Sequence, residues 1–357
     1  MKNILVVFTG GTIGSVAADG IISPESGTSF QLIRLFQQQY AEHQDIRFDT
    51  LQPLQLLSEN LAPAAWPVLI AAVEAAQPLQ YDGIIITHGT DTLAYTGCAL
   101  SFYFNACPIP LLLVSSNYPL NHAEANGVDN FICAVEFIRQ IKSAGVFVPY
   151  RNPQHTTQLH QATRLACSLQ LSGDFFSVQG QSYRHFDKRQ FSPLTQPMPQ
   201  TPRPPFPLKA DFSARILMIK PYPGLDYSCF NLDAIDAVLH DLYHSGTACA
   251  SSEWGENHSL VEFIKRCAQR AIPVYLAPAL KSVDAYHSTR VLIEQGAHII
   301  WNMSIEAAYV KLLLAYGNID GVENIMDFMA MDIAGEHLVR ACVGRTKAPK
   351  SFYRYAP

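Results

Sequence analysis

The chain has 357 residues, of which 48% are hydrophobic and 15% charged, and this balance excludes an intrinsically disordered protein. Its formal net charge is −5 and no block of Lys or Arg occurs, which argues against a nucleic acid or an acidic membrane as partner. No apolar stretch reaches the roughly 18 residues of a transmembrane helix, and the N-terminal apolar run is too short for a signal peptide. We therefore expect a cytoplasmic protein, more typical in length of two domains than of one.

Short apolar runs alternate with helical patterns in the first 150 residues. A β-branched apolar run is typical of a buried strand, and apolar residues three and four apart are typical of one helix face. On this basis we expect strands at 3–8, 83–87 and 111–115, which alternate with helices at 64–76, 92–104 and 124–142. Buried strands that alternate with helices predict a parallel sheet covered on both faces.

A proline-rich segment then interrupts the pattern. Seven prolines lie between residues 193 and 212, and proline removes backbone donors and disfavours helix, so this segment is predicted to be an extended linker. It would join an N-terminal catalytic domain, residues 1–192, to a smaller α/β domain, residues 213–357. In the second domain we expect strands at 215–219, 248–252, 273–277 and 298–301, and helices at 232–244, 260–270 and 305–316.

Histidines and cysteines carry little functional signal. His240 and His244 are four residues apart on the predicted helix 232–244, a spacing that metals use, but a solvated helix face is favoured because no H-E-x-x-H pattern accompanies them. His155 and His160 are placed in a polar loop. The eight cysteines form no C-x-x-C pair and are expected to be apolar core residues rather than disulfides.

The loop after the first predicted strand is the first candidate site, because ligands of open parallel sheets bind at the carboxyl ends of strands. It reads Thr9-Gly10-Gly11-Thr12-Ile13, where two glycines allow a sharp turn and a close approach to a ligand. A glycine turn needed only for geometry is the alternative. The spacings of dinucleotide and phosphate loops are absent, which disfavours a nucleotide-binding protein that uses the same turn.

The loop after the strand at 83–87 is the second candidate site. It reads His88-Gly89-Thr90-Asp91-Thr92. Helix capping explains Asp91 or Thr92, since both residue types accept hydrogen bonds from free N–H groups. Capping does not explain a histidine, a glycine and two hydroxyls together at a strand end.

The two loops, in this order, resemble the L-asparaginase family, which carries T-G-G-T-I at the first strand and H-G-T-D-T at a later one. Weaker similarity continues through Leu93-Ala94-Tyr95-Thr96 and, in the second half, through Tyr222-Pro223-Gly224. The resemblance implies a two-domain α/β fold with a larger N-terminal parallel-sheet domain, and a homodimer or homotetramer. It implies a small amino-acid amide as substrate, with no cofactor and no metal.

The resemblance also implies roles for particular residues. An amide is a poor electrophile, so hydrolysis is split into acylation and deacylation through an activated hydroxyl. Thr12 would attack the side-chain amide carbon of L-asparagine or L-glutamine, and Thr90 would be the second catalytic hydroxyl. Asp91 would bind the α-ammonium of the substrate through charge-assisted bonds. Gly11 and Gly89 would contribute backbone to the substrate site.

A third loop matches the family at two positions. Ser58 fits the position that binds the substrate carboxylate, and Glu59 fits the position that binds the α-amino group. A plain polar turn at 58–60, before the helix that Pro63 opens, explains these residues equally well.

Two positions depart from the family. Ile21 stands where the family has a tyrosine that helps to activate the nucleophile, and Arg164 is the nearest cation to the place of its catalytic lysine. Isoleucine cannot move a proton, and arginine stays protonated and cannot act as a base. Three interpretations stay open: an asparaginase that uses other groups, such as Glu59, His155, His160 or a residue of a neighbouring subunit; an amidohydrolase for another amide; and a catalytically weak paralogue that binds an amino acid.

Overall fold

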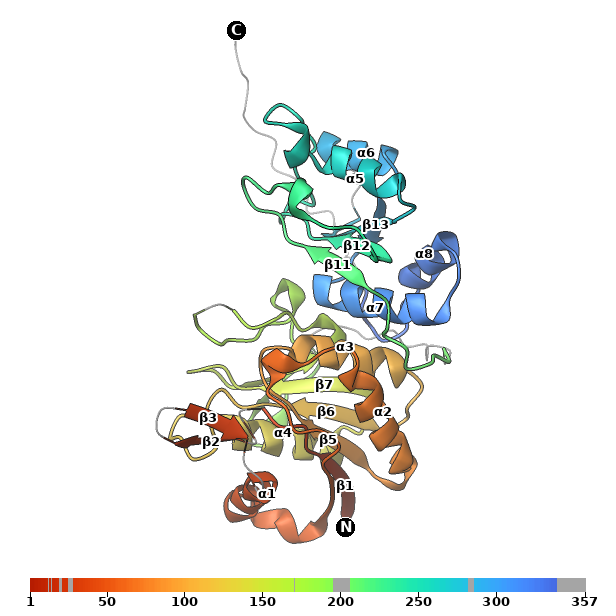
Figure 1. The fold of residues 1–357 in the computed structure, drawn as a ribbon. Coiled ribbons are helices and arrows are strands. Elements are labelled where there is room, and N and C mark those ends of the chain that lie inside the picture. Colours follow the sequence, from red (N-terminus) through yellow and green to blue (C-terminus); the bar gives the residue numbers. More distant parts are fainter. Residues whose placement is uncertain are drawn as a thin grey trace, which may run out of the picture.

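A computed structural model describes residues 1–11, 13, 15–18, 21–24, 28–169, 171–194, 206–281 and 286–338. For 15–18, 21–24 and 28–30 it describes the backbone alone. The chain forms a larger N-terminal and a smaller C-terminal α/β domain, stacked end to end (Figure 1). None of the helices in the described residues is long and apolar enough to cross a membrane.

An eight-stranded sheet forms the centre of the larger domain, with its strands in the order β10-β9-β8-β7-β6-β5-β1-β4. Five neighbouring strands are parallel: β1 (Lys2–Val7), β4 (Ile46–Leu51), β5 (Gly83–Thr87), β6 (Pro110–Val114) and β7 (Gly145–Tyr150). The other three are antiparallel: β8 (Thr157–Gln161), β9 (Arg184–Asp187) and β10 (Gln190–Phe191). The predicted parallel sheet is therefore confirmed for the part that holds both motifs. The strands β8 to β10 were not predicted, because they are polar and lack apolar runs.

Helices cover both faces of this sheet, as expected. One pair, α1 and α4, packs on one face, and the other pair, α2 and α3, packs on the opposite face. Successive residues of β1 point to opposite faces, so Val6 contacts the first pair and Val7 the second. The bounds are α1 (Thr28–Gln39), α2 (Ala65–Ala75), α3 (Leu93–Tyr103) and α4 (Gly127–Gln140). A separate hairpin joins β2 (Ser15–Ala18) to β3 (Ile21–Pro24).

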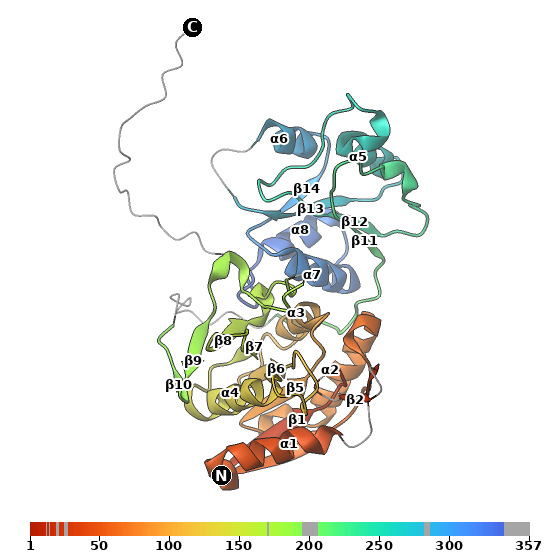
Figure 2. The same cartoon turned by 90° about the vertical axis from the view of Figure 1, so that its left-hand side faces the viewer.

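The smaller domain is built on a four-stranded parallel sheet in the order β11-β12-β13-β14. Its strands are β11 (Ile216–Ile219), β12 (Ala237–His240), β13 (Val274–Ala279) and β14 (His298–Trp301). Its helices are α5 (Leu260–Ala268), α6 (His287–Glu294), α7 (Ile305–Asn318) and α8 (Val322–Ala330). Helix α7 packs on α3 of the larger domain, so one hydrophobic core continues through both domains (Figure 2).

Two expectations for the smaller domain are wrong. The helix predicted at 232–244 is instead a loop followed by β12, and the strand predicted at 248–252 is a loop. Because β12 lies inside the sheet, all four of its residues are buried and show no alternation that would mark a strand. His240 therefore shares no helix with His244, and its buried ring lies 2.8 Å from the Tyr227 hydroxyl oxygen.

The expected linker lies partly outside the described residues, and from 206 onwards it packs on both domains, with the Phe206 ring 5.1 Å from that of Phe328 in α8. Phe212 is buried, and its ring lies 5.0 Å from that of Trp66 in an edge-on contact. The domain boundaries themselves stay a prediction. Of the cysteines, Cys98, Cys133 and Cys267 are buried as expected, whereas Cys229 and Cys249 are exposed.

Candidate active site

The order of the strands brings three loops together. Strand β1 lies between β4 and β5, because the chain leaves β1 to form β4 on one side and then crosses to form β5 on the other. In open α/β sheets a crevice opens beyond the carboxyl ends of strands where the order reverses in this way. The loops after β1, β4 and β5 therefore meet at one edge of the sheet.

The glycine loop after β1 packs directly on the turn after β5. Gly10 and Gly11 have positive φ angles of 101° and 77°, which favour glycine. The Gly11 N–H donates to the Leu56 carbonyl at 2.9 Å, and a Cβ atom at Gly11 would lie 2.6 Å from the Cα atom of Gly89. No larger side chain fits at Gly11, so the two loops can approach this closely only because residue 11 is glycine.

The third loop contributes Ser58, which lies in a short 3-10 turn, η3 (Ser58–Asn60). The Ser58 hydroxyl donates to Asp91 Oδ2 at 2.8 Å and accepts from the Asp91 N–H at 3.2 Å. The Thr92 hydroxyl donates to the Ser58 carbonyl at 3.0 Å. A Cβ atom at Gly89 would lie 2.6 Å from Ser58 Cβ, so these two residues are in close contact. Ser58 is buried and Asp91 is exposed, so the hydrogen bonds to Ser58 hold the Asp91 carboxylate at the surface where the three loops meet.

His88 lies beneath this turn and is fully buried. Its Nδ1 atom is 2.8 Å from the Gly89 carbonyl oxygen. Burial lowers the pKa of His88 to about 4, although the Gly89 carbonyl and the Asp91 carboxylate each raise it. The ring is therefore neutral at pH 7, and the proton on Nδ1 holds the carbonyl of Gly89 in place. The sequence motif contains His88, but its place under the turn could not be read from it.

For Thr90 and Glu59, two further predicted site residues, the structure gives the position in the chain and the degree of burial. Thr90 is half-buried between Gly89 and Asp91, and Glu59 is exposed on the η3 turn. Thr12 lies outside the described residues. Its neighbour Ile13 is buried in the core beneath α1 and α4.

The two departures from the family pattern can now be located. Ile21 lies in β3, and its side chain lies outside the described residues. Arg164 ends a 3-10 turn, η5 (Ala162–Arg164), and donates from Nε to the Gly335 carbonyl at 2.7 Å and from a terminal nitrogen to the His337 carbonyl at 2.8 Å. The guanidinium thus binds a segment at residues 331–338, which we call the C-terminal strap.

His160 was expected in a polar loop, and this expectation is wrong. It lies in β8 and is fully buried, with Nδ1 2.8 Å from the Ser177 hydroxyl oxygen. Burial, with a smaller contribution from His185, lowers the pKa of His160 to about 3, so the ring is neutral at pH 7. Across the described parts of the chain, no group of three or more His, Cys, Asp or Glu residues is placed to hold a metal ion.

Comparison with known proteins adds four findings. The N-terminal asparaginase family model matches residues 3–185, just over half of the chain. The L-asparaginase of Thermococcus kodakarensis is 28% identical over 93% of this chain and 98% of its own length, and its solved structure matches with a TM-score of 0.78 over 94% of this chain and 99% of that one. A glutamyl-tRNA(Gln) amidotransferase subunit of Methanosphaera stadtmanae is 24% identical over 94% of this chain and 76% of its own length. L-asparaginase I of Vibrio cholerae, 23% identical, shares the fold with a TM-score of 0.76 over 95% of this chain and 99% of that one.

Proposed function

This chain belongs to the asparaginase family of amidohydrolases, and we propose that it hydrolyses the side-chain amide of L-asparagine to L-aspartate and ammonia with Thr12 as nucleophile. The observation that carries the proposal is the meeting of Gly11, Ser58, Gly89 and Asp91 at the carboxyl ends of β1, β4 and β5. It explains why a glycine turn, a buried serine and a carboxylate occur together where three strands end.

The charged ends of the substrate fit the polar groups of this crevice. In this structure the Asp91 carboxylate accepts a hydrogen bond from the Ser58 hydroxyl. We infer that the α-ammonium of the substrate takes the place of the Ser58 hydroxyl as the hydrogen-bond donor to Asp91. The Ser58 hydroxyl can then donate to the α-carboxylate of the substrate. Glu59, exposed on the same turn, would be a second acceptor for the ammonium. Charge-assisted bonds of this kind orient a substrate as well as bind it.

In the proposed reaction the Thr12 hydroxyl oxygen attacks the amide carbon and its proton passes to the leaving nitrogen. Ammonia departs and an acyl-threonine ester remains, which water then cleaves to the carboxylic acid. Backbone N–H groups of the two loops, other than the Gly11 N–H that donates to Leu56, would stabilise the oxyanion, because the loops pack on each other where β1 and β5 end. Thr90 would supply the second hydroxyl of the site.

A second candidate function, production of ammonia within a larger amidotransferase, is suggested by the relatives that are glutamyl-tRNA(Gln) amidotransferase subunits. This chain spans 76% of the Methanosphaera stadtmanae protein and 98% of the Thermococcus kodakarensis asparaginase. We propose a homodimer or homotetramer, and light scattering of the purified chain tests it, since a monomer would contradict it.

The experiment measures ammonia released from L-asparagine and from L-glutamine by the wild type and by T12A. T156A is the matched control, because Thr156 is an exposed threonine outside the three loops. We expect release that T12A abolishes and T156A retains, with asparagine the better substrate. A folded wild type that releases no ammonia from either amide would overturn the proposal, and equal release by T12A would overturn the role of Thr12.

A further inference from the structure

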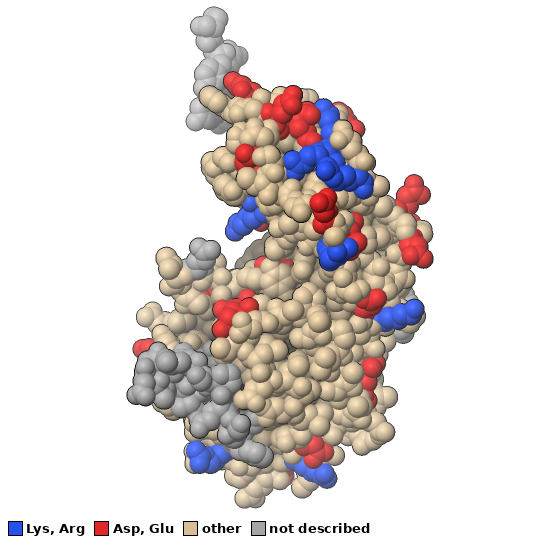
Figure 3. Space-filling model, viewed as in Figure 1, with Lys and Arg blue, Asp and Glu red and all other residues tan. Residues whose placement is uncertain are grey.

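A cavity of about 590 Å3 lies where the two domains meet, and none of its lining residues belongs to the site described above. Most of the lining comes from 241–246, 278–280 and 301–306, the segments at or just beyond the ends of β12, β13 and β14. This is the carboxyl edge of the smaller parallel sheet, where α/β domains bind ligands. Ala166, Val178 and Gln179 of the larger domain close the other side, and the surface is hollowed at this junction (Figure 3).

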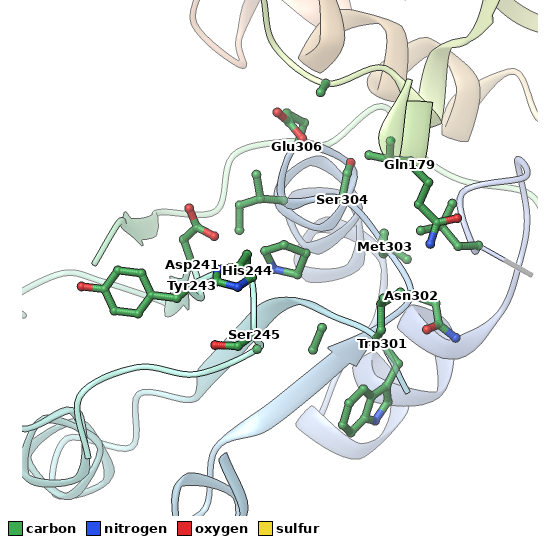
Figure 4. A pocket seen from close by; sticks show the side chains of 18 of the residues that line it. Gln179, Asp241, Tyr243, His244, Ser245, Trp301, Asn302, Met303, Ser304 and Glu306 are labelled. Carbon is green, nitrogen blue, oxygen red and sulfur yellow. The ribbon is translucent and has the colours of Figure 1, made fainter. Parts of the chain in front are cut away.

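The charge of this cavity is negative. Asp241 comes from the loop after β12, and Glu306 comes from the first turn of α7 (Figure 4). The lining, as far as the structure describes it, contains no Lys or Arg. Glu306 is buried and has a backbone donor, the Cys167 N–H at 3.1 Å from Oε1, but no ion pair within the described residues.

The two carboxylates repel each other. Burial raises the pKa of Asp241; the Leu242 N–H and Lys220 lower it, and the Glu306 carboxylate raises it again. Lys220 is exposed and makes no ion pair with Asp241 within the described residues. A cation bound between Asp241 and Glu306 would relieve their repulsion in a place where partial burial strengthens the attraction.

Aromatic side chains complete the lining. Tyr243 and Tyr286 are 39% and 63% exposed, and Trp301 is half-buried at the end of β14. Aromatic faces attract ammonium ions through the ring quadrupole, most strongly where water is displaced. Carboxylates together with aromatic rings form a surface that suits organic ammonium ions better than anions or neutral molecules.

We propose that this cavity is a second ligand site, which binds a small aliphatic ammonium compound with two amino groups and no carboxylate. Two carboxylates, Asp241 and Glu306, match two amino groups. A carboxylate on the ligand would face the same acidic wall without a cation among the described lining residues, so an amino acid of the substrate type fits less well. A volume of about 590 Å3 exceeds what a four-carbon diamine needs and leaves room for water.

Occupation of this site would stabilise the docking of the two domains. Leu338 of the C-terminal strap lines the cavity, and its N–H donates to the Asn302 carbonyl at 2.8 Å. The same strap is bound by Arg164 of the larger domain. A ligand that contacts both domains and the strap binds the folded, docked chain and not the unfolded chain, so it raises the temperature of unfolding by mass action.

The test is isothermal titration and thermal unfolding with 1,4-diaminobutane at low ionic strength, beside 1-aminobutane, 1,4-butanediol and L-asparagine. We expect saturable one-to-one binding of the diamine, binding of 1-aminobutane at least five-fold weaker, and none of the diol. D241N and E306Q are each expected to weaken diamine binding at least ten-fold. E294Q is the matched control, because Glu294 is an exposed carboxylate at the end of α6, and it should leave binding unchanged.

The variant K220M gives an independent check, because Lys220 is the neighbouring cation that lowers the pKa of Asp241. Removing it should tighten diamine binding two- to five-fold. The proposal is overturned if the diamine does not bind saturably, if D241N and E306Q bind it as the wild type does, or if L-asparagine binds this cavity more tightly than the diamine. The last outcome is recognised when D241N or E306Q changes the binding of L-asparagine and D91N, in the crevice of the larger domain, does not.

Discussion

Replacing Lys311 by methionine is expected to lower the free energy of unfolding by about 3–5 kcal/mol, the usual cost of leaving one partner of a buried ion pair alone. The side chains of Lys311 and Glu336 have no exposed surface, and Nζ lies 2.6 Å from Glu336 Oε1. The Glu336 carboxylate also accepts from the Ile333 N–H at 3.1 Å and from the Ala334 N–H at 2.7 Å. This carboxylate therefore ties the C-terminal strap to α7.

The pKa of Glu336 shows the strength of this pairing. Burial raises the pKa, but the Lys311 ammonium and further hydrogen bonds to the carboxylate together lower it to about 2. Methionine fills the volume of the lysine stem and carries no charge, so in K311M the carboxylate stays buried without a cation or takes up a proton. Either outcome removes stability at pH 7. In the wild type, the contribution of the Lys311–Glu336 pair to the free energy of unfolding is fully present above the ordinary pKa of a glutamate. It is lost as the pH falls towards 2.

The assay is urea and thermal unfolding, followed by circular dichroism and tryptophan fluorescence. An unfolding entropy of about 2.1 cal/mol/K per residue over 357 residues gives ~0.75 kcal/mol/K, so the expected loss is a fall of roughly 4–7 °C in Tm if the chain unfolds as one unit. K311M/E336Q should recover more than half of the loss, because glutamine keeps an acceptor for the strap without a charge. The control K265M breaks an exposed pair with Glu262 and should change stability by less than about 0.5 kcal/mol. A K311M protein within about 1 kcal/mol of the wild type, or a double variant less stable than the single one, would refute the reasoning.

Three further predictions concern the active-site turn, pH and Arg164. G89A should lower kcat/KM for amide hydrolysis at least a hundred-fold with a normal fold, because its Cβ atom would overlap Ser58; steady-state ammonia assays test this, and an active G89A contradicts it. The free energy of unfolding should fall as the pH drops below about 6.5, by up to roughly 1.4 kcal/mol per pH unit for each buried neutral histidine. The reason is that each of these histidines takes up a proton in the unfolded chain but stays neutral in the folded chain. The three histidines with the largest lowering of the pKa by burial are His88, His160 and His240. H160N should reduce this slope by about a third in urea titrations at pH 7, 6 and 5, and an unchanged slope would contradict it. R164M should lower stability by about 1.5–3 kcal/mol while any amidohydrolase activity keeps its pH profile; a shifted profile would instead give Arg164 a part in the chemistry.

Local sequence was sufficient for the elements that carry the motifs. Strand β5 and helix α3 lie within one or two residues of their predicted bounds, because a short β-branched run after glycine favours a strand and the longer stretch that follows favours a helix. The same patterns placed the two glycine-containing loops at strand ends. They could not place Ser58 against Asp91, since that contact joins residues 33 apart through the position of β4 beside β1.

Short motifs and periodicity in the sequence were enough to predict the family and the parallel α/β core correctly. The residues of the candidate site were proposed from the same motifs and stay a prediction. Tertiary structure alone decided which strands are neighbours, that His240 lies in a buried strand, and that Arg164 binds the C-terminal strap. It also decided that Asp241 and Glu306 line one cavity. The physical reason is that burial on both faces of a strand erases its periodic signal, and contacts between distant segments depend on the packing of the whole chain.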